Sequence, residues 1–145
     1  MVHQIVSRLV RRYGTRDPFE IARLRHIILI TEPLGSIRGY YSCSYRHQVI
    51  HLNSNLEENQ LRFTCAHELG HAILHPKANT PFLRQNTLFP ISRYEWEASR
   101  FAVCLLIDDS ALEEYDGCTI PQLAQAFGVS PELIAYRLKK RPPQP

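Results

Sequence analysis

Apolar residues repeat with a helical period at the start of the chain. Between residues 2 and 13 they recur three and four positions apart, as in an amphipathic helix, and Gly14 follows as a helix end. Residues 17–20 then read Asp-Pro-Phe-Glu, which is typical of an N-cap followed by proline in the first turn. The sequence therefore predicts two N-terminal helices, the second running through about Leu24.

Three stretches with β character come next. Residues 26–32 are rich in isoleucine, residues 36–43 contain isoleucine and tyrosine, and residues 46–53 alternate aliphatic with polar side chains. Pro-Leu-Gly at 33–35 separates the first two stretches, and Ser-Tyr at 44–45 is short enough for a tight turn before the third. Together they predict a small antiparallel sheet of three strands.

After the third strand the helical period returns. N-cap residues at 53–55, with glutamates three positions later, predict the start of a helix that continues to His75, where Pro76 ends it. Residues 77–93 contain prolines and little periodicity, which predicts a long loop. Residues 94–107 then repeat as another helix.

The C-terminal part predicts a pair of short helices at 120–138, one on each side of Gly128. An acidic stretch with an Asp-Gly turn, residues 108–118, precedes the pair. No internal repeat or linker interrupts the pattern. We therefore expect residues 1–145 to form one domain of the α+β class.

Composition narrows the class of protein. Hydrophobic residues make up 44% and charged residues 21% of the 145 positions, which favours a globular fold over disorder. The net charge of +3 is mild and does not by itself favour nucleic acid as a partner. The longest uncharged apolar run, residues 101–107, is far shorter than the roughly 18 residues that span a bilayer. Arginines within the first helix also argue against a secretory signal.

The four cysteines are scattered and form no C-x-x-C pair. In a chain without a recognisable signal, such cysteines are expected to be reduced thiols, which predicts a cytoplasmic protein. We expect Cys65 and Cys104 to fill space in the core, and no zinc site built from cysteine.

The candidate chemistry lies in residues 67–71, which read His-Glu-Leu-Gly-His. On a helix, His67 and His71 are about 40° apart on one side, so both imidazoles can bind one zinc ion. Glu68 is rotated about 100° from His67, beside the two histidines, where a base for an activated water is needed. Gly70 lowers helix propensity by about 1 kcal/mol, which a close backbone approach at this point would explain.

A catalytic zinc usually takes three protein ligands and one water. The metzincin pattern, with a glycine and a third histidine further along, is absent because these positions are Leu74 and Lys77. A glutamate on the following helix is the alternative. Glu97 shares the apolar face of Phe101, so we predict that it points inward and binds the metal. Glu95, about 160° away, is expected nearer solvent or behind the ligands.

These motifs resemble the ImmA/IrrE family of metallo-endopeptidases. The match lies in residues 67–75 (H-E-L-G-H-A-I-L-H) and 95–102 (E-W-E-A-S-R-F-A), and the upstream segments D-P-F-E-I-A, G-Y-Y-S and I-H-L-N-S-N-L are also similar. The resemblance covers about residues 17–138. Two positions depart from the family pattern: Ser99 replaces the usual asparagine, and Asp108 follows the Leu-Leu-Ile end of the helix where a proline is common.

The resemblance implies a zincin-like fold, with zinc held by His67, His71 and Glu97 and with Glu68 as the catalytic acid. It further implies a protein substrate, typically a helix-turn-helix repressor of a phage or mobile element that is cut to derepress genes. We therefore predict a cytoplasmic zinc-dependent endopeptidase that acts on a protein partner and does not contact membrane.

An extended substrate is expected to pair with the edge of the sheet at residues 36–43. Charge developing on the scissile carbonyl needs a donor besides zinc. The candidates are His75, Tyr40, Tyr41 and Tyr94.

Two other interpretations stay open. Residues 123–134 are typical of a helix-turn-helix, and basic residues follow them, as in a DNA-binding regulator. Glu132 near the start of the second helix would repel phosphates, however, which favours a packing role or a dock for a repressor. Alternatively, zinc could stabilise a fold that acts by binding alone. The open fourth position and Glu68 argue against such a scaffold, because structural sites are normally closed by four protein ligands.

Overall fold

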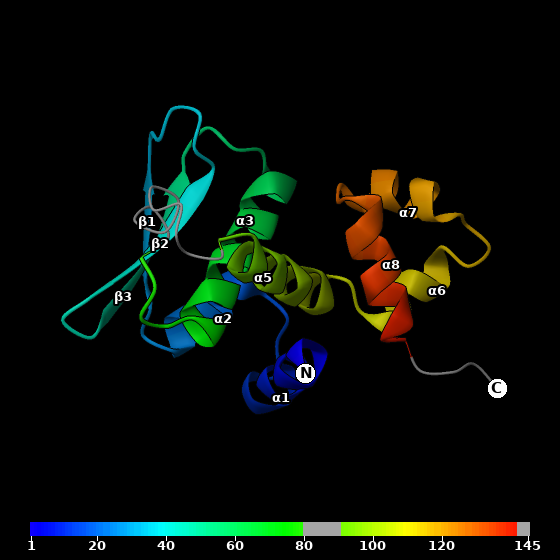
Figure 1. The fold of residues 1–145 in the computed structure, drawn as a ribbon, viewed down its shortest axis with the longest axis horizontal. Helices are drawn as coiled ribbons and strands as arrows, with labels where there is room; N and C mark the ends of the chain where they lie inside the picture. Colours follow the sequence, from blue (N-terminus) through cyan, green and yellow to red (C-terminus); the bar gives the residue numbers. More distant parts are fainter. Residues whose placement is uncertain (80–90, 142–145) are drawn as a thin grey trace.

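The computed structural model describes residues 1–79 and 91–141 of the chain. A three-stranded sheet lies at one side, helix α3 (Glu58–Leu74) packs against it, and α5 (Ile91–Leu106) crosses α3 on the other side (Figure 1). The remaining C-terminal helices lie beyond α5. Helix α3, which carries the His-Glu-Leu-Gly-His segment, is therefore the middle layer.

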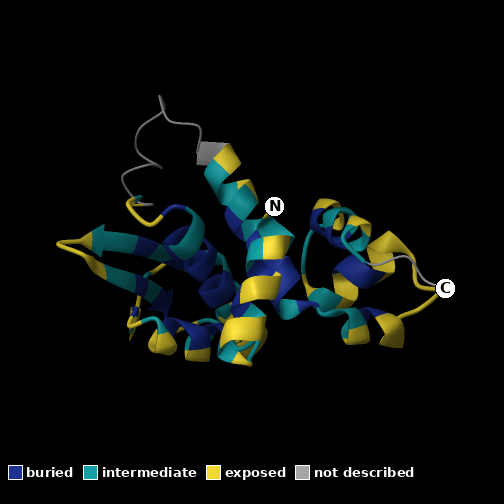
Figure 2. Cartoon of the chain, turned by 90° about the horizontal axis from the view of Figure 1, so that it is seen from below, coloured by how far each residue is buried: buried dark blue, intermediate teal, exposed yellow. Residues whose placement is uncertain are grey.

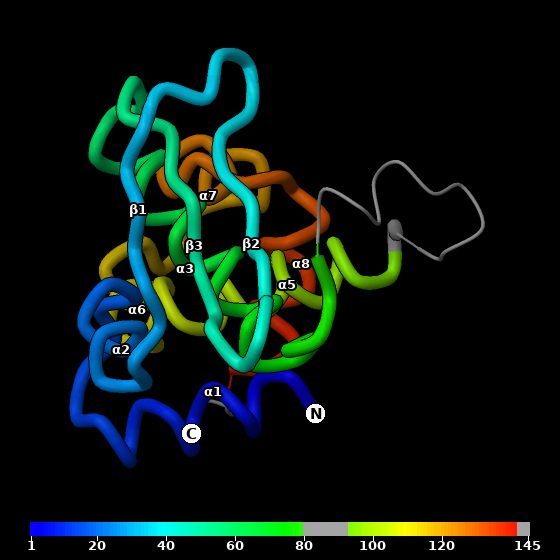
Figure 3. Tube along the Cα trace, turned by 90° about the vertical axis from the view of Figure 1, so that its left-hand side faces the viewer, coloured from blue at the N-terminus to red at the C-terminus, as the bar shows by residue number. Residues whose placement is uncertain are grey.

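The sheet is mixed, not wholly antiparallel as the sequence predicts. Its strands are β1 (Ile28–Glu32), β2 (Gly39–Ser44) and β3 (His47–Asn53), and they lie in the order β1-β3-β2 (Figure 3). Strands β2 and β3 are antiparallel, as predicted, whereas β1 pairs with β3 in parallel. The prediction is therefore wrong for one of the two pairings.

The connections explain the parallel pairing. Tyr45 and Arg46 have φ angles of 51° and 70°, the positive values of a tight hairpin turn, so β2 and β3 pair locally. This hairpin occupies one edge of β3 and leaves the other edge for β1. The link from β1 to β2 crosses the end of β3, where Asn53 Nδ2 donates to the carbonyls of Gly35 and Ile37 at 2.9 Å each. Strand β1 consequently runs in the same direction as β3.

The N-terminal helices form where the sequence predicts them. Helix α1 (Val2–Tyr13) ends at Gly14, which is left-handed with φ 69° and donates its N–H to Val10 O. Helix α2 (Pro18–Leu24) begins after Asp17, whose side chain accepts from the backbone N–H of Phe19 at 3.0 Å. Both predictions are confirmed.

Helix α3 begins later than its sequence suggests. Its N-cap is Glu57, whose side chain makes no capping hydrogen bond. The predicted cap residue Asn53 instead holds the turn beside the sheet and accepts from the N–H of Asn55. The helix ends at Leu74, and His75 caps it before Pro76. The chain therefore leaves α3 within one residue of the predicted end.

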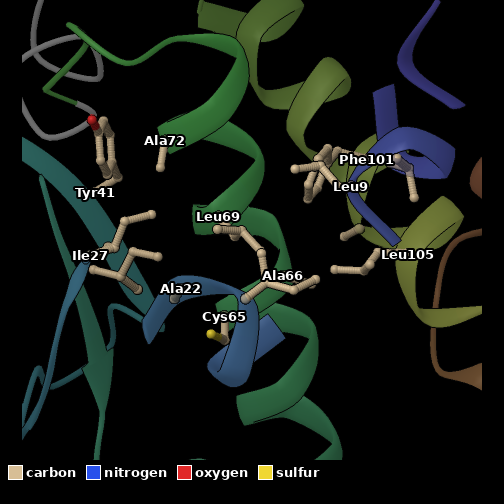
Figure 4. Close-up of a cluster of buried hydrophobic side chains, with 14 of the residues drawn as sticks. Leu9, Ala22, Ile27, Tyr41, Cys65, Ala66, Leu69, Ala72, Phe101 and Leu105 are labelled. Carbon is tan, nitrogen blue, oxygen red and sulfur yellow. The ribbon is translucent and has the colours of Figure 1, made fainter. Parts of the chain in front are cut away.

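Gly70 explains how closely α3 and α5 approach. A Cβ built on Gly70 would lie 3.1 Å from the Cα and the carbonyl O of Ala98, and 3.1 Å from Cβ of Phe101. The predicted close approach is thus confirmed. Around it, the α3 side chains Ala66 and Leu69 are fully buried between the sheet side and the side of α1 and α5 (Figure 4).

Helix α5 begins at Ile91, three residues before its predicted start. Most of the predicted loop at 77–93, residues 80–90, lies outside the described residues. In Figure 2 the buried residues gather along the central helices, whereas the tip of the β2–β3 hairpin is exposed.

The C-terminal helices build a second apolar cluster. The predicted pair is present as α7 (Ile120–Phe127) and α8 (Pro131–Lys139), and the acidic stretch before it contains α6 (Asp109–Glu114), which the sequence prediction missed. Leu123 and Ile134 of the pair pack with Val103 of α5, so the pair is seated on the rest of the fold. Buried Arg137 donates to Ile107 O at 2.7 Å.

The cysteines and the lengths of the apolar helices bear on two expectations from composition. Cys65 and Cys104 are buried and unpaired, as expected of cysteines that fill the core. Among the described residues, no helix combines the length and the apolar character needed to cross a bilayer.

Candidate metal centre

Three histidines at intervals of four residues line one side of α3. His67 is partly exposed, His71 is fully buried, and His75 at the end of the helix is 9% exposed. The rings of His67 and His71 lie 5.0 Å apart between centroids, and those of His71 and His75 lie 5.3 Å apart. The helical spacing thus places a row of imidazoles at the junction with α5.

Glu95 of α5 meets the first two histidines. Its Oε2 lies 2.7 Å from Nε2 of His67, and its Oε1 lies 3.4 Å from Nε2 of His71. One possible ligand atom from each of these three residues lies within 4.8 Å of the others. The structure therefore brings together the two predicted histidines with the carboxylate that the sequence analysis placed nearer solvent.

Glu97, the carboxylate predicted to face these two histidines, lies elsewhere. Its Oε2 is 2.8 Å from Nε2 of His75, and its Oε1 accepts from Nε of Arg93 at 3.1 Å. Glu97 does point inward, but the crossing at Gly70 decides which part of α3 it meets. Two residues along a helix is a rotation of about 200°, so Glu95 and Glu97 reach different turns of α3.

The second ring nitrogen of His67 and of His71 also has a partner. Nδ1 of His67 lies 3.1 Å from Oγ of Ser99, and Nδ1 of His71 lies 3.1 Å from Nδ1 of His75. Neither Ser99 nor His75 was predicted to contact these histidines. Spacing could have suggested both, because Ser99 follows Glu95 by four residues and His75 follows His71 by four.

Burial and neighbouring side chains shift the pKa values of Glu95 and His71. Burial would raise the pKa of Glu95, but its hydrogen bond with His67 and the proximity of the His71 ring outweigh burial and hold that pKa well below its usual range. Burial lowers the pKa of His71, and the neighbouring His67 lowers it further, while Glu95 acts in the opposite direction. Near neutral pH, an ionised carboxylate therefore faces a neutral imidazole, and these are the forms that bind metal ions.

Glu68 lies beside this group, as its helical position predicts. It is 1% exposed and lines a cavity of about 510 Å³ together with His67, Ser99 and Gly39. A Cβ on Gly39 would lie 2.6 Å from a backbone carbonyl of β3 and 2.8 Å from Cγ2 of Thr64. Glycine thus lets the start of β2 approach α3 closely enough to form one wall of the cavity.

The four candidate oxyanion donors differ in what they contact. Tyr41 donates its hydroxyl hydrogen to the carbonyl of Pro76, and Tyr40 stacks on a histidine of β3. Because side chains alternate along a strand, Tyr40 lies on the sheet face away from buried Tyr41 and α3. His75 contacts His71 and Glu97 as described above. Tyr94 packs edge-on against His75, 4.4 Å between ring centroids, and stays a candidate.

The donor set suits a divalent metal ion. Two imidazole nitrogens and one carboxylate oxygen form a familiar three-ligand set for catalytic zinc, with a fourth position left for water. Within the described part of the chain, Nε2 of His71 is a buried nitrogen without a well-formed hydrogen bond. Its separation of 3.4 Å from Glu95 is long for a hydrogen bond, as expected of two groups that can share an ion.

Comparison with known proteins identifies the family. Residues 23–139 match the model of the peptidase family M78, described as the IrrE N-terminal-like domain. The chain belongs to this family. Its ImmA/IrrE resemblance is thereby confirmed, and the family is one of metallopeptidases, which implies a metal ion.

Two relatives match this family member along most of its length. The uncharacterized immunity region protein 2 of Bacillus phage phi105 is 41% identical over 136 residues, which is 92% of this chain and 86% of that protein. The metallopeptidase ImmA of Bacillus subtilis strain 168 is 30% identical over 144 residues, which is 95% of this chain and 83% of that protein.

A solved structure shares the fold of this family member. A Mycobacterium tuberculosis transcriptional regulator matches with a TM-score of 0.57 and 19% sequence identity. The match covers 97% of this chain but only 48% of the regulator, so this chain spans about half of that protein. At this identity the likeness concerns the fold alone.

Proposed function

We propose that this metallopeptidase-family chain is a zinc-dependent endopeptidase. In this proposal His67, His71 and Glu95 bind the zinc, and Glu68 is the catalytic base. The observation that carries the proposal is the convergence of those three side chains beside Glu68, on the wall of an open cavity. Glu95 replaces Glu97 in the ligand set, because Glu95 is the carboxylate that contacts both histidines.

Each protein group has a defined task. When bound, the metal ion supplies a Lewis acid that polarises the scissile carbonyl and makes water more acidic. The Glu68 carboxylate takes up the proton from the attacking water and delivers it to the leaving amine nitrogen. Because Glu68 is 1% exposed, little bulk water competes for this proton.

The substrate backbone is proposed to add to the edge of the sheet. Strand β2 lies at one edge in the order β1-β3-β2, and the cavity is lined by residues 36–39 at its start. An extended peptide paired with β2 would therefore pass Glu68 and the metal ligands. At the far end of β2, the N–H of Cys43 already donates to Oδ1 of Asn79 at 2.9 Å, so the first part of the strand is the proposed docking edge.

A second cavity extends the proposed substrate path. It has a volume of about 440 Å³, and it shares Arg38, Phe63 and Ser99 with the cavity beside Glu68. Its other wall is the turn between α7 and α8, including Phe127. We infer that substrate residues next to the cleaved bond occupy this extension, with the C-terminal helix pair as part of the substrate-binding surface.

The proposed substrate is a helix-turn-helix repressor, cut in the cytoplasm to derepress phage or mobile-element genes. Support comes from a relative whose name places it in the immunity region of a phage and from another named ImmA. DNA binding by this chain is not favoured. Arg137, one of the basic residues behind that alternative, is 6% exposed and pairs with Asp109 at 2.7 Å.

The test is cleavage of candidate repressors by the purified protein, followed by gel electrophoresis and mass spectrometry. Zinc-loaded protein should cut its cognate repressor at a defined bond, and a chelator should stop cleavage. Glu68→Gln should keep its zinc and lose about 10²–10⁴-fold in rate, because a general base is removed. Glu58→Gln, on an exposed position of the same helix, is the matched control and should cut normally.

Two results would refute the proposal. If Glu68→Gln cut as fast as the unmodified protein, Glu68 would have no part in the chemistry. If a repressor bound stoichiometrically and stayed intact with zinc present, the chain would be a binding protein without turnover. A gel-shift assay at several salt concentrations would reveal any direct DNA binding.

A further inference from the structure

A continuous chain of contacts runs from Nδ1 of His71, the ring nitrogen on the side away from Glu95, to the surface of α5. Nδ1 of His71 lies 3.1 Å from Nδ1 of His75, and Nε2 of His75 lies 2.8 Å from Oε2 of Glu97. The other oxygen of Glu97 accepts from Arg93 at 3.1 Å. His71 is fully buried and His75 is 9% exposed, so the contact between the two rings is shielded from water.

The carboxylate of Glu97, at the end of this chain of contacts, determines which ring nitrogens of His75 and His71 carry a proton. An ionised carboxylate only accepts hydrogen bonds, so Glu97 requires a proton on Nε2 of His75. In a neutral imidazole the other nitrogen is then an acceptor, so Nδ1 of His75 accepts from His71. The proton of His71 must therefore reside on Nδ1, and its Nε2 lone pair faces Glu95. This is the tautomer in which His71 can bind a metal ion through Nε2.

We propose that Glu97 and His75 are positioning residues that hold His71 in its metal-binding tautomer and orientation. The inference rests on the proposed metal site at His67, His71 and Glu95. Metal-binding histidines usually donate their second N–H to a carboxylate, a carbonyl or water. Here a second histidine stands between the ligand and the carboxylate, so Glu97 acts on the metal site without touching it.

The geometry keeps this chain of contacts in place. His75 is the C-cap of α3, its backbone N–H bonds to His71 O at 2.7 Å, and its ring packs edge-on against Tyr94. Glu95 and Glu97 lie on the first turns of α5, so a single helix supplies both the ligand and the anchor. Any shift of α5 would therefore disturb both.

Zinc affinity measured by competition with a chromophoric chelator tests the proposal. His75→Phe keeps a ring against Tyr94 but cannot accept from His71, and Glu97→Ala removes the anchor. Each should weaken zinc binding by about 10–100-fold, the usual effect of losing a group behind a ligand. His75→Gln, which retains an acceptor and a donor, should recover part of the affinity. Glu114→Gln is the control and should change affinity less than about twofold, because Glu114 is an exposed residue of α6 outside this chain of contacts.

Nitrogen NMR of the histidine side chains in the zinc-loaded, unsubstituted protein gives a second readout that does not depend on folding of a variant. The expected spectrum has a proton on Nδ1 of His71 and on Nε2 of His75. In Glu97→Ala the His75 signals should move toward the other tautomer. A proton on Nδ1 of His75 in the unsubstituted protein would overturn the proposal.

The outcomes separate this inference from the proposed function. If Glu95→Ala loses zinc while folded His75→Phe and Glu97→Ala bind it within about twofold of the unsubstituted protein, the positioning role is refuted and the metal site stands. If Glu95→Ala binds zinc normally, the metal site itself is wrong and the inference falls with it. Circular dichroism confirms that each variant is folded before its affinity is compared.

Discussion

The helix pairs α3–α5 and α7–α8 are both packed through apolar residues, yet their polar side chains lie in different places. In α7–α8, polar groups cap helix ends: Thr119 forms a reciprocal capping box, and Ser130 accepts from the N–H of Leu133. In α3–α5, Glu68 and His71 are 1% and 0% exposed in the middle of the packing. Buried polar groups lower stability unless partnered, and the buried Arg137 of α8 is partnered by Ile107 O and Asp109. The cluster of acids and histidines between α3 and α5 is therefore the one expected to have a function.

Removal of the third ligand should give the largest difference between the two pairs. Glu95→Ala deletes the carboxylate that contacts His67 and His71, so zinc affinity should fall by more than the about 10–100-fold typical of residues behind a ligand. Glu132→Ala, an exposed acid at the start of α8, is the matched control and should bind zinc normally. Metal analysis after dialysis measures the zinc content of both variants. Equal zinc content would show that Glu95 matters no more for zinc binding than an exposed acid of α8.

Forcing α3 and α5 apart should have the next largest effect. Gly70→Val places a branched side chain where even a Cβ would lie 3.1 Å from the Ala98 backbone, so unfolding free energy should fall by about 1–3 kcal/mol. Because α5 carries Glu95, zinc binding should weaken as well. Gly128→Ala, at φ +69°, should cost about 1–2 kcal/mol through backbone strain and leave zinc affinity unchanged. Urea denaturation and chelator competition measure the two quantities.

Acid should destabilise the metal-free protein through α3–α5. The pKa of His71 is lower in the folded than in the unfolded chain, so the unfolded chain binds more protons as pH falls below the ordinary imidazole value of about 6.5. Stability should therefore decrease with falling pH, and Glu95 and Glu97, whose pKa values are also lowered, extend the loss below the ordinary glutamate range.

Urea denaturation at several pH values in the presence of a chelator measures this loss. His3 of α1 also has a lowered pKa, through burial and the nearby Lys140, so the comparison is made in His3→Gln protein. Adding His71→Gln to that background should flatten the dependence between pH 6.5 and the lower pKa of folded His71. If the slope of unfolding free energy against pH stayed the same, His71 would not contribute to the loss of stability in acid.

The smallest effect is expected at a helix cap of the other pair. Ser130→Ala removes the side chain that accepts from the N–H of Leu133, so stability should fall by about 0.5–2 kcal/mol. Zinc affinity should not change, since the cap is remote from the ligands in the sequence and on another helix pair. A loss of zinc binding in this variant would mean that the two pairs are energetically coupled.

Local patterns in the sequence predicted the features that depend on neighbouring residues. Gly14 and Asp17 end and begin helices as expected, and the four-residue spacing of His67 and His71 places both on one side of α3. Gly70 also proved to mark a close helix contact. Each of these follows from helix geometry within one or two turns, which the sequence determines directly.

The choice between Glu95 and Glu97 could not be made from helical periodicity. Both residues lie on the first turns of α5, and an apolar stripe shows only which side of a helix faces inward. Which carboxylate meets which histidine depends on where α3 and α5 cross. That crossing is set at Gly70 and Ala98, in contacts between residues distant in the sequence. The direction of β1 likewise depended on which edge of β3 the hairpin left open.

The sequence by itself therefore determined that His67, Glu68 and His71 lie close together on one helix, and it determined the family. These are read from short-range spacing and residue identity, which do not depend on how the helices pack. Only the tertiary structure decided the partner of each imidazole: Glu95 at His67 and His71, and Glu97 at His75. The physical reason is that a rotation and translation of one helix against another reassigns every contact, while the sequence pattern of each helix stays the same.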